Sequence, residues 1–357
     1  MWRFILGLGC GGVYPLAATL TAESSSKQVN RAKLVALTFS MQGIGYCIVP
    51  LFAWVLIFIL GEQSDLTWRI LLGVGALPGI ILTFHRSSRR QKIKVDSSNS
   101  IFDEEESHDL RSQTIGNHKN EQPSQTSVLD AIRCEKDLFR KLVGTAGCWF
   151  IFDVLYYGNT LFQPIVLDAV FGGSETTQKT ARDAAIIALL ALPGYFISVV
   201  VVGYQSPRFI QIQGFLVMTI LYAIIGMTFS SLSSNRPLLL LLYGASFFFS
   251  DYGPNTTTFM LPSMTFSPAC RSTLNGISAA SGKLGALLGA TMFEPAAKNF
   301  GDDTVMMICS ALSLIGMLMT LLCVRSDVGL GSSHTGAKQR QQIAVSRKHS
   351  APSLLDF

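Results

Sequence analysis

The chain has 357 residues, of which 49% are hydrophobic and 14% charged, and its formal net charge at pH 7 is +5. A typical soluble protein carries about 25% charged residues, so the composition excludes an ordinary soluble globular protein. The apolar residues are bunched into about nine runs, most of them long enough for the roughly 20 residues that a helix needs to cross a bilayer. The sequence therefore predicts an all-α, polytopic membrane protein with about nine transmembrane helices.

The first apolar run contains GLGCGGVYPLAA at 7–18, whose glycines spell the G-x-G-x-x-G of a dinucleotide-binding turn. That turn needs a β-strand before the glycines and an acidic residue about 20 positions later. Only six residues precede Gly7, and Glu23 comes early. A signal peptide is a second interpretation, but glycines and Pro15 interrupt its apolar region. We favour a membrane helix in which small residues let neighbouring helices approach closely.

A long polar segment divides the runs into three before it and six after it. Its richness in Ser, Asn, Gln, Lys and Glu is typical of a disordered linker. The runs lie at 2–22, 32–60, 66–84, 140–165, 183–204, 209–232, 237–263, 272–293 and 304–324. The predicted domains are a partial N-terminal helical half at 1–84, a linker at 85–139, a six-helix C-terminal half at 140–325 and a polar tail at 326–357.

Basic residues predict the orientation in the membrane. Cytoplasmic loops carry an excess of Lys and Arg, and the short segment directly after the third run is strongly basic. Its basic residues are Arg86, Arg89, Arg90, Lys92 and Lys94. We therefore expect the linker and the C-terminal tail to be cytoplasmic.

The cysteines and histidines do not form the patterns of a metal or cofactor site. The seven cysteines are scattered without a C-x-x-C pair, and the five histidines lie in polar segments without an H-E-x-x-H motif. The polar segments also lack a nucleophile, paired catalytic carboxylates or a cofactor loop. We expect no metal, no cofactor and no enzyme activity.

Two ionisable residues stand out inside the apolar runs, Asp153 and Lys283. Because such groups cost a few kcal/mol inside a membrane, each marks a candidate functional site. On a helix, Trp149, Asp153 and Tyr157 are spaced i, i+4 and i+8 and share one face. Hydrogen bonds between helices would explain the two aromatic residues alone. With Asp153 between them, we favour a substrate or proton pathway.

The stretch DYGPNTTTF at 251–259 places Gly253 and Pro254 in the middle of a run. These residues can break the helix so that backbone groups line a cavity, which gives Asn255 a reason to face inward. The N-T-T sequence also matches a glycosylation site, but the interior of a span is out of reach of that modification. Gln42, in MQGIGY, is another polar group among small residues, and alone it favours a structural role.

Seven segments resemble, in the same order, the phosphate:proton symporters of the major facilitator superfamily. The combination of GPN-T-T-F with R-S-T…G-I-S-A-A-S-G-K carries most of the specificity, and the likeness covers nearly all of the chain except the linker and tail. The segments are WRFILGLGCGGVYPLAATLTAES, FSMQGIGY, WRILLGVGALPG, GTAGCWFIFDVLYYGNTLFQ, ALPGYFISV, GPNTTTFMLPSMTF and RSTLNGISAASGKLGALLGA.

The resemblance implies a twelve-helix transporter of two six-helix halves, which moves inorganic phosphate inward with protons by alternating access, usually in the plasma membrane. The opening stretch looks like the family's fourth helix, so we expect three helices to be absent. Its glycines would then let helices pack around a central cavity. The implied partners are inorganic phosphate, protons and the lipid bilayer, with no nucleic acid.

The resemblance also implies a set of phosphate-contacting residues. In this family-based prediction Lys283 supplies the countercharge, and a protonated Asp153 donates a hydrogen bond, which couples proton binding to phosphate binding. The set is Tyr14, Gln42, Trp149, Asp153, Tyr157, Asn255 and Lys283.

Two departures from the family pattern favour weaker proton coupling. Val13 stands where the family usually has an acidic residue, and the loop GYQSPR at 203–208 lacks the usual acidic residue and G-R pair. Two alternatives follow: a transporter of another small anion, and a non-transporting remnant or phosphate sensor of the same fold.

Overall fold

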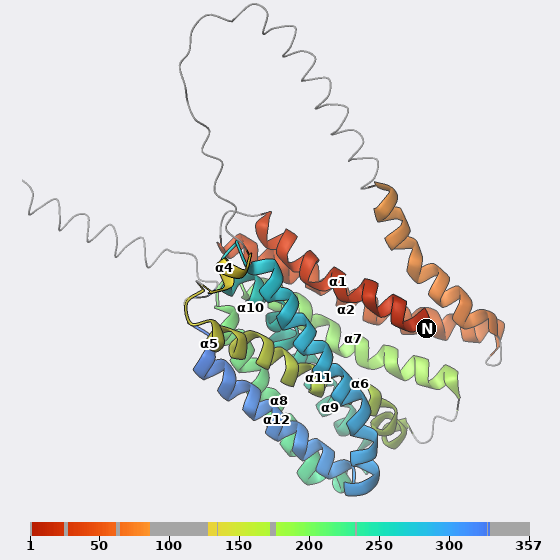
Figure 1. Cartoon of the computed structure of the whole chain (residues 1–357). Helices are drawn as coiled ribbons and strands as arrows, with labels where there is room; N and C mark the ends of the chain where they lie inside the picture. The colour runs from red at the N-terminus through yellow and green to blue at the C-terminus, as the bar shows by residue number, and fades with distance from the viewer. Residues whose placement is uncertain are drawn as a thin grey trace, which may run out of the picture. The chain divides into compact units, whose positions relative to one another are not determined.

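Helices make up all the regular structure in the part of the chain that the computed structural model describes (Figure 1). The described residues are 2–24, 28–61, 65–85, 128–133, 135–171, 176–232, 234–326 and 328. Most of the predicted linker and nearly all of the predicted tail lie outside these residues. Contacts divide the chain into two units, Met1–Leu51 with Ser127–Phe357, and Phe52–Thr126. The boundaries expected at 84, 139 and 325 stay predictions.

The first three apolar runs are helices. They are α1 (Trp2–Glu23), α2 (Gln28–Leu60) and the helix Asp65–His85. The boundary between the two units falls within α2. Residues of α2 up to Leu51 belong to the larger unit, and the rest of α2 and the helix Asp65–His85 belong to the smaller unit.

Each of the six later runs is also a continuous helical stretch, preceded by the short helix α4 (Val128–Arg133). Two of the stretches contain a π-helical turn. In chain order they are α5 (Leu138–Leu142) with η1 (Val143–Gly147) and α6 (Cys148–Phe171), α7 (Thr177–Val201), α8 (Pro207–Leu232), α9 (Arg236–Ser250) with η2 (Asp251–Asn255) and α10 (Thr256–Thr265), α11 (Arg271–Phe300), and α12 (Asp302–Cys323).

Six helices of the described residues are long and apolar enough to cross a membrane: α1, α2, Asp65–His85, α7, α8 and α12. The predicted spans outside this set are the stretches α5 to α6, α9 to α10, and α11. These three stretches carry Asp153, Asn255 and Lys283, and the first two are interrupted by π turns.

Local sequence explains where several helices begin and end. Pro207 is the first residue of α8, a position where its missing N–H costs no hydrogen bond. The Thr176 side chain caps the start of α7 by accepting a hydrogen bond from the backbone N–H of Lys179. Between α11 and α12, Gly301 has a φ of 90°, a conformation that favours glycine and ends the helix.

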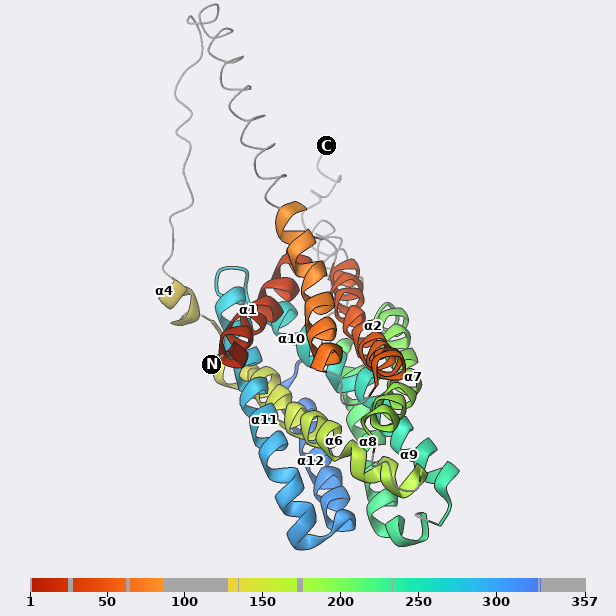
Figure 2. The same cartoon turned by 90° about the vertical axis from the view of Figure 1, so that its right-hand side faces the viewer.

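Glycines of α11 allow it to pack closely against α6, which lies beside it in Figures 1 and 2. A Cβ added at Gly285 would stand 2.1 Å from the Phe150 carbonyl oxygen, and one at Gly289 would stand 2.2 Å from that of Val154. Their spacing matches the small-xxx-small pattern of close helix contacts in membranes.

The glycines of the opening stretch make no such contact in the described structure. A Cβ added at any of these four α1 glycines would meet no other atom within 4 Å in the described structure. The four are Gly7, Gly9, Gly11 and Gly12. Their expected role in close helix packing therefore stays a prediction, and within the described residues the close contact is made by the glycines of α11.

Buried apolar side chains form two main clusters around the site. One cluster contains residues of α6, α7, α8, α9, α11 and α12. Its largest members include Phe152, Phe215 and Tyr243. The other joins α1 and α2 to the C-terminal helices through small residues such as Ala18 and Ala36, which pack with aromatic residues of α6, α7 and α10. The predicted site residues lie at this second cluster.

Candidate functional site

One small cavity is lined by all seven residues of the predicted phosphate set. They come from α1, α2, α6, η2 and α11, so the fold brings together residues that are far apart in the sequence. The lining consists of Tyr14, Phe39, Gln42, Trp149, Asp153, Tyr156, Tyr157, Asn255 and Lys283. The cavity has a volume of about 10 Å³, which is room for no more than a single water molecule. A phosphate ion therefore fits only after side chains or helices move.

An ion pair crosses the cavity between α6 and α11. The ammonium nitrogen Nζ of Lys283 lies 3.2 Å from Oδ2 of Asp153 and donates a hydrogen bond of 3.0 Å to the Tyr157 hydroxyl. It also lies over the Tyr14 ring, 5.1 Å from its centroid, in a cation–π contact. Asp153 is only 3% exposed, so Lys283 supplies the countercharge that this buried carboxylate needs.

The spacing along α6 explains why these groups meet. Trp149, Asp153 and Tyr157 follow one another at intervals of four residues, so they share a face of the helix. The Trp149 indole packs directly against α11, because a Cβ added at Gly282 would stand 2.5 Å from its Cδ1 atom and 2.7 Å from Nε1. A glycine at 282 thus sets the position of one of the site's N–H donors.

Tyr14 and Gln42 form the part of the cavity that comes from α1 and α2. The Tyr14 hydroxyl donates a hydrogen bond to Oε1 of Gln42. The Tyr14 ring also packs edge-on against Phe259, with centroids 5.9 Å apart. At the other side of α1, Nδ2 of Asn275 donates to the carbonyl oxygen of Pro15 at 3.2 Å, which ties α1 to α11.

Asn255 ends the π turn η2, where Gly253 has non-helical backbone angles of φ −99° and ψ −106°. Hydroxyl groups satisfy carbonyl oxygens around this break. Thr256 donates to the Asp251 carbonyl at 2.6 Å, and Thr257 donates to that of Gly253 at 2.9 Å. The threonines of G-P-N-T-T-T therefore stabilise a break that holds Asn255 at the cavity.

The amide nitrogen Nδ2 of Asn255 donates two hydrogen bonds. One goes to the Tyr195 hydroxyl at 2.9 Å, and the other goes to Oδ1 of Asp251 at 2.6 Å. Both amide hydrogens are therefore committed to protein acceptors in this conformation.

Asp251 is a residue that the sequence reasoning missed. It is only 1% exposed and lies inside an apolar run, so the rule that singled out Asp153 and Lys283 applies to it equally. The sequence shows this ionisable residue as the first letter of DYGPN. The helix-breaking residues Gly253 and Pro254 that follow it led to Asn255 being chosen as the candidate instead.

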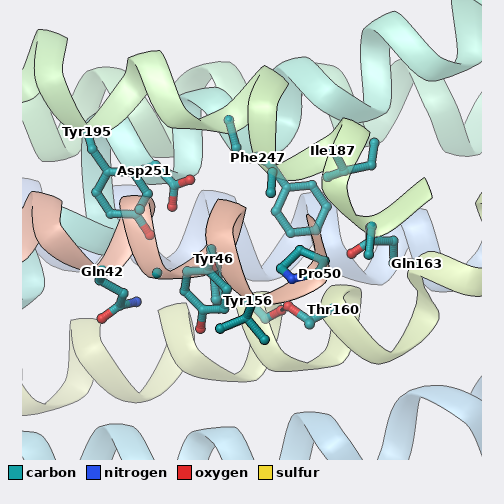
Figure 3. A pocket seen from close by; sticks show the side chains of 16 residues that line it. Gln42, Tyr46, Pro50, Tyr156, Thr160, Gln163, Ile187, Tyr195, Phe247 and Asp251 are labelled. Carbon is teal, nitrogen blue, oxygen red and sulfur yellow. Dashed lines mark hydrogen bonds between the residues drawn. The ribbon is translucent and has the colours of Figure 1, made fainter. Parts of the chain in front are cut away.

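Asp251 lines a second and larger cavity of about 500 Å³ (Figure 3). Figure 3 shows Asp251 and Tyr195 at the end of this cavity where Gln42 lies, with Gln163 at the other end. Gln42 and Tyr156 line both cavities. The two cavities are therefore neighbours that share a wall.

Neither Val13 nor the loop 203–208 is part of the lining of the small cavity. The Val13 side chain is 61% exposed. In the loop, Arg208 donates through Nη2 to the Leu321 carbonyl at 2.8 Å, which joins the start of α8 to the end of α12. Nearby, Arg271 and Glu23 form an ion pair of 3.7 Å between α11 and α1.

The described residues contain no group of three or more His, Cys, Asp and Glu side chains that could hold a metal ion. The charged chemistry of the small cavity comes instead from Asp153 and Lys283.

Comparisons with known proteins relate the chain to membrane transporters. The family model described as "Sugar (and other) transporter" matches residues 1–333. The chain is 33% identical over 355 residues to the "Probable inorganic phosphate transporter 1-6" of Arabidopsis thaliana, with 89% of this chain and 69% of the relative covered. It is 31% identical over 373 residues to the "Low affinity inorganic phosphate transporter 4" of Medicago truncatula, with 90% and 68% covered.

A solved structure shares the fold. The major facilitator superfamily proton:xylose symporter XylE, bound to 6-bromo-6-deoxy-D-glucose, matches with a TM-score of 0.67 and 16% sequence identity. The match covers 92% of this chain and 71% of the symporter.

Proposed function

Because the chain belongs to the sugar (and other) transporter family of the major facilitator superfamily, and curated relatives are named inorganic phosphate transporters, we propose that it carries inorganic phosphate across a membrane by proton-coupled symport. The observation that carries this proposal is the Asp153–Lys283 pair at the small cavity. A lysine surrounded by hydrogen-bond donors suits an anion, and a carboxylate paired with it suits a proton.

Phosphate binds among groups that can satisfy its oxygen atoms. The Lys283 ammonium supplies charge and three N–H donors, and the Trp149 indole supplies one N–H. Hydroxyl groups of Tyr14 and Tyr157 and the amide of Gln42 complete the donors, each of which lines the small cavity. The small volume of that cavity makes this conformation a closed one, in which the donors bond to one another.

Proton coupling follows from competition for Lys283. While Asp153 is ionised, it holds the ammonium group and repels an incoming anion. A proton on Asp153 removes that charge, turns the carboxyl into a donor and releases Lys283 to phosphate. Proton binding and phosphate binding then favour each other by the same factor, as linkage requires.

Alternating access needs helices on two sides of the site to move apart and together. The small cavity lies between α1 and α2 on one side and α6, η2 and α11 on the other. The Tyr14–Gln42 bond stays within the first group and the Lys283–Asp153 bond within the second. The cavity can therefore open between the groups while each keeps its own polar contact. We assign the protein to the plasma membrane, with linker and tail in the cytoplasm.

Uptake of phosphate into vesicles tests this function. The full chain is purified and reconstituted, and labelled phosphate uptake is measured with the outside acidic and with no pH gradient. We expect saturable uptake that the gradient stimulates, and a loss of about 10-fold or more in Lys283→Gln and Asp153→Asn, since each removes a charged partner. Lys298→Gln, on the same helix but 72% exposed, is the matched control and should keep uptake.

Three outcomes would contradict the proposal. Uptake at the wild-type rate in both Lys283→Gln and Asp153→Asn would show that transport does not require the ion pair. Phosphate binding without uptake would instead identify a phosphate sensor. If other anions such as sulfate compete more strongly than phosphate, the substrate is a different small anion.

A further inference from the structure

Asp251 is a buried carboxylate that does not take part in the Asp153–Lys283 ion pair. None of the ion pairs formed by the described residues includes it. Its Oδ1 atom accepts the 2.6 Å hydrogen bond from Nδ2 of Asn255. An ionised carboxylate with no cation beside it is costly inside a membrane, and such residues commonly serve proton pathways.

The polar groups that interact with Asp251 come from α2, α6, α7, α8 and η2. They are Tyr46 and Cys47 of α2, Tyr156 of α6, Tyr195 of α7 and Tyr222 of α8, together with Asn255 after it on η2. All of these groups are neutral at pH 7. Asp251 therefore differs from Asp153, whose charge is balanced by Lys283.

Asp251 also lines the larger cavity. This cavity has a volume of about 500 Å³, and its polar lining groups include Gln42, Tyr46 and Gln163 (Figure 3). The carboxyl group of Asp251 therefore borders a space outside the small cavity.

Asn255 connects this carboxylate to the predicted phosphate site. Its side chain lines the small cavity, yet its two amide hydrogens are bonded to Asp251 and to Tyr195. An ionised carboxylate is a strong acceptor and holds the amide N–H. A protonated carboxyl is a weaker acceptor and can itself donate, so it releases that N–H to a phosphate oxygen.

We propose that Asp251 is a second proton-binding residue of this transporter, and that its protonation frees Asn255 to bind phosphate. The inference rests on the proposed function. One proton taken up from solution forms the carboxyl O–H bond as phosphate binds, and the same proton leaves as phosphate leaves. Asp251 acts through Asn255, so it is a positioning residue rather than a phosphate ligand.

The test measures phosphate affinity at pH 6 and pH 8 by calorimetry on the purified full chain. The wild type, Asp251→Asn and Asp183→Asn are compared at each pH, so that the titration of phosphate itself cancels. Asp183 is the matched control because it is a fully buried aspartate on α7 outside both cavities. We expect the ratio of the two affinities to fall by about fivefold or more in Asp251→Asn and to stay unchanged in Asp183→Asn.

A wild-type ratio in a folded Asp251→Asn protein would overturn the proposal. If that variant does not fold, Asp251→Glu carries the test. It keeps the proton site but moves it by one methylene group, so an unchanged pH midpoint of phosphate binding would also overturn it.

An infrared measurement separates this proposal from the function on which it rests. A protonated carboxyl has its own carbonyl-stretch band, which we expect to change between pH 6 and pH 8 in the wild type and to lose one component in Asp251→Asn. If the wild type binds no phosphate at either pH, the proposed function fails. The infrared difference then still shows whether Asp251 exchanges a proton, and identical spectra would reject that.

Discussion

The Lys283 ammonium nitrogen lies 3.2 Å from the Asp153 carboxylate, and the two residues are 130 positions apart in the chain. Asp153 lies on α6 and Lys283 on α11, and each supplies the countercharge that the other needs. The contact therefore has a structural function in joining α6 to α11 as well as the proposed function in transport.

A double-mutant cycle separates these two functions. Asp153→Asn and Lys283→Gln should each lower the melting temperature of the detergent-purified protein, because each leaves one charge without its partner. The double variant should recover part of the loss, with a coupling of about 0.5–3 kcal/mol. Uptake should fall by about 10-fold or more in all three variants. Additive changes in stability would show that the two residues do not interact in the folded protein.

Gly282→Ala should weaken phosphate binding without unfolding the chain. The new methyl group would stand 2.5 Å from the Trp149 ring, so the indole must move and its N–H donor moves with it. Loss of one hydrogen bond corresponds to about a fivefold lower affinity, measurable by calorimetry. Gly276→Ala on the same helix is the control, since a Cβ there meets nothing within 4 Å. Equal affinities in the two variants would contradict the placement of Trp149.

Gly285→Ala should destabilise the contact between α6 and α11. Its methyl group would meet the Phe150 carbonyl at 2.1 Å, and forcing an extra group into such a contact costs about 1–3 kcal/mol. The expected result is a lower melting temperature. Gly9→Ala on α1 should leave the melting temperature unchanged or raise it slightly, because alanine favours helix and the site is open. The reverse order of effects would mean that α1, not α11, makes the close contact.

Glu135 predicts a pH dependence of stability outside the membrane spans. Burial raises the pKa of its carboxyl, but hydrogen bonds from Lys141, the Ser267 backbone and the Cys270 thiol outweigh burial and lower that pKa to about 2 from its usual 4.5. The stabilisation is fully present above pH 4.5 and is lost as the pH falls towards 2. At about 1.4 kcal/mol per pKa unit, it amounts to about 3 kcal/mol at most.

The measurement compares melting temperatures of the wild type and Glu135→Gln at pH 7, 5 and 3. The variant should be less stable at pH 7 and pH 5, and the gap should narrow at pH 3. Asp130→Asn provides the control, because Asp130 forms only an exposed ion pair with Arg133 at 3.7 Å. A gap that is constant from pH 7 to pH 3 would contradict the lowered pKa.

Much of the fold could be predicted from the sequence, because membrane helices have a strong and local signal. Each of the nine apolar runs is a helical stretch in the described residues. The contacts of those helices were less predictable. The glycines at 7–12 and those at 285 and 289 look alike as patterns, and only the neighbouring helix decides which of them a close contact requires.

The sequence also allowed the prediction that the seven site residues lie together, because their types and order match a family pattern. The structure brings them to one cavity, and their contact with phosphate stays a prediction. Asp251 could not be connected to Asn255 by spacing alone. The two residues are four apart, but the π turn and the Gly253 break decide that their side chains meet.

The π turns η1 and η2 each hold one residue more than α-helical winding would. Because every residue of an α-helix turns the chain by about 100°, the extra residue sets the rotational phase of the helix that follows. Rewinding η2 as an α-helix would rotate α10 relative to α9 by about that angle, and rewinding η1 would do the same to Trp149, Asp153 and Tyr157. Winding or unwinding a π turn would therefore rotate the following helix by about a quarter turn, and this rotation would change which side chains of that helix face the cavity.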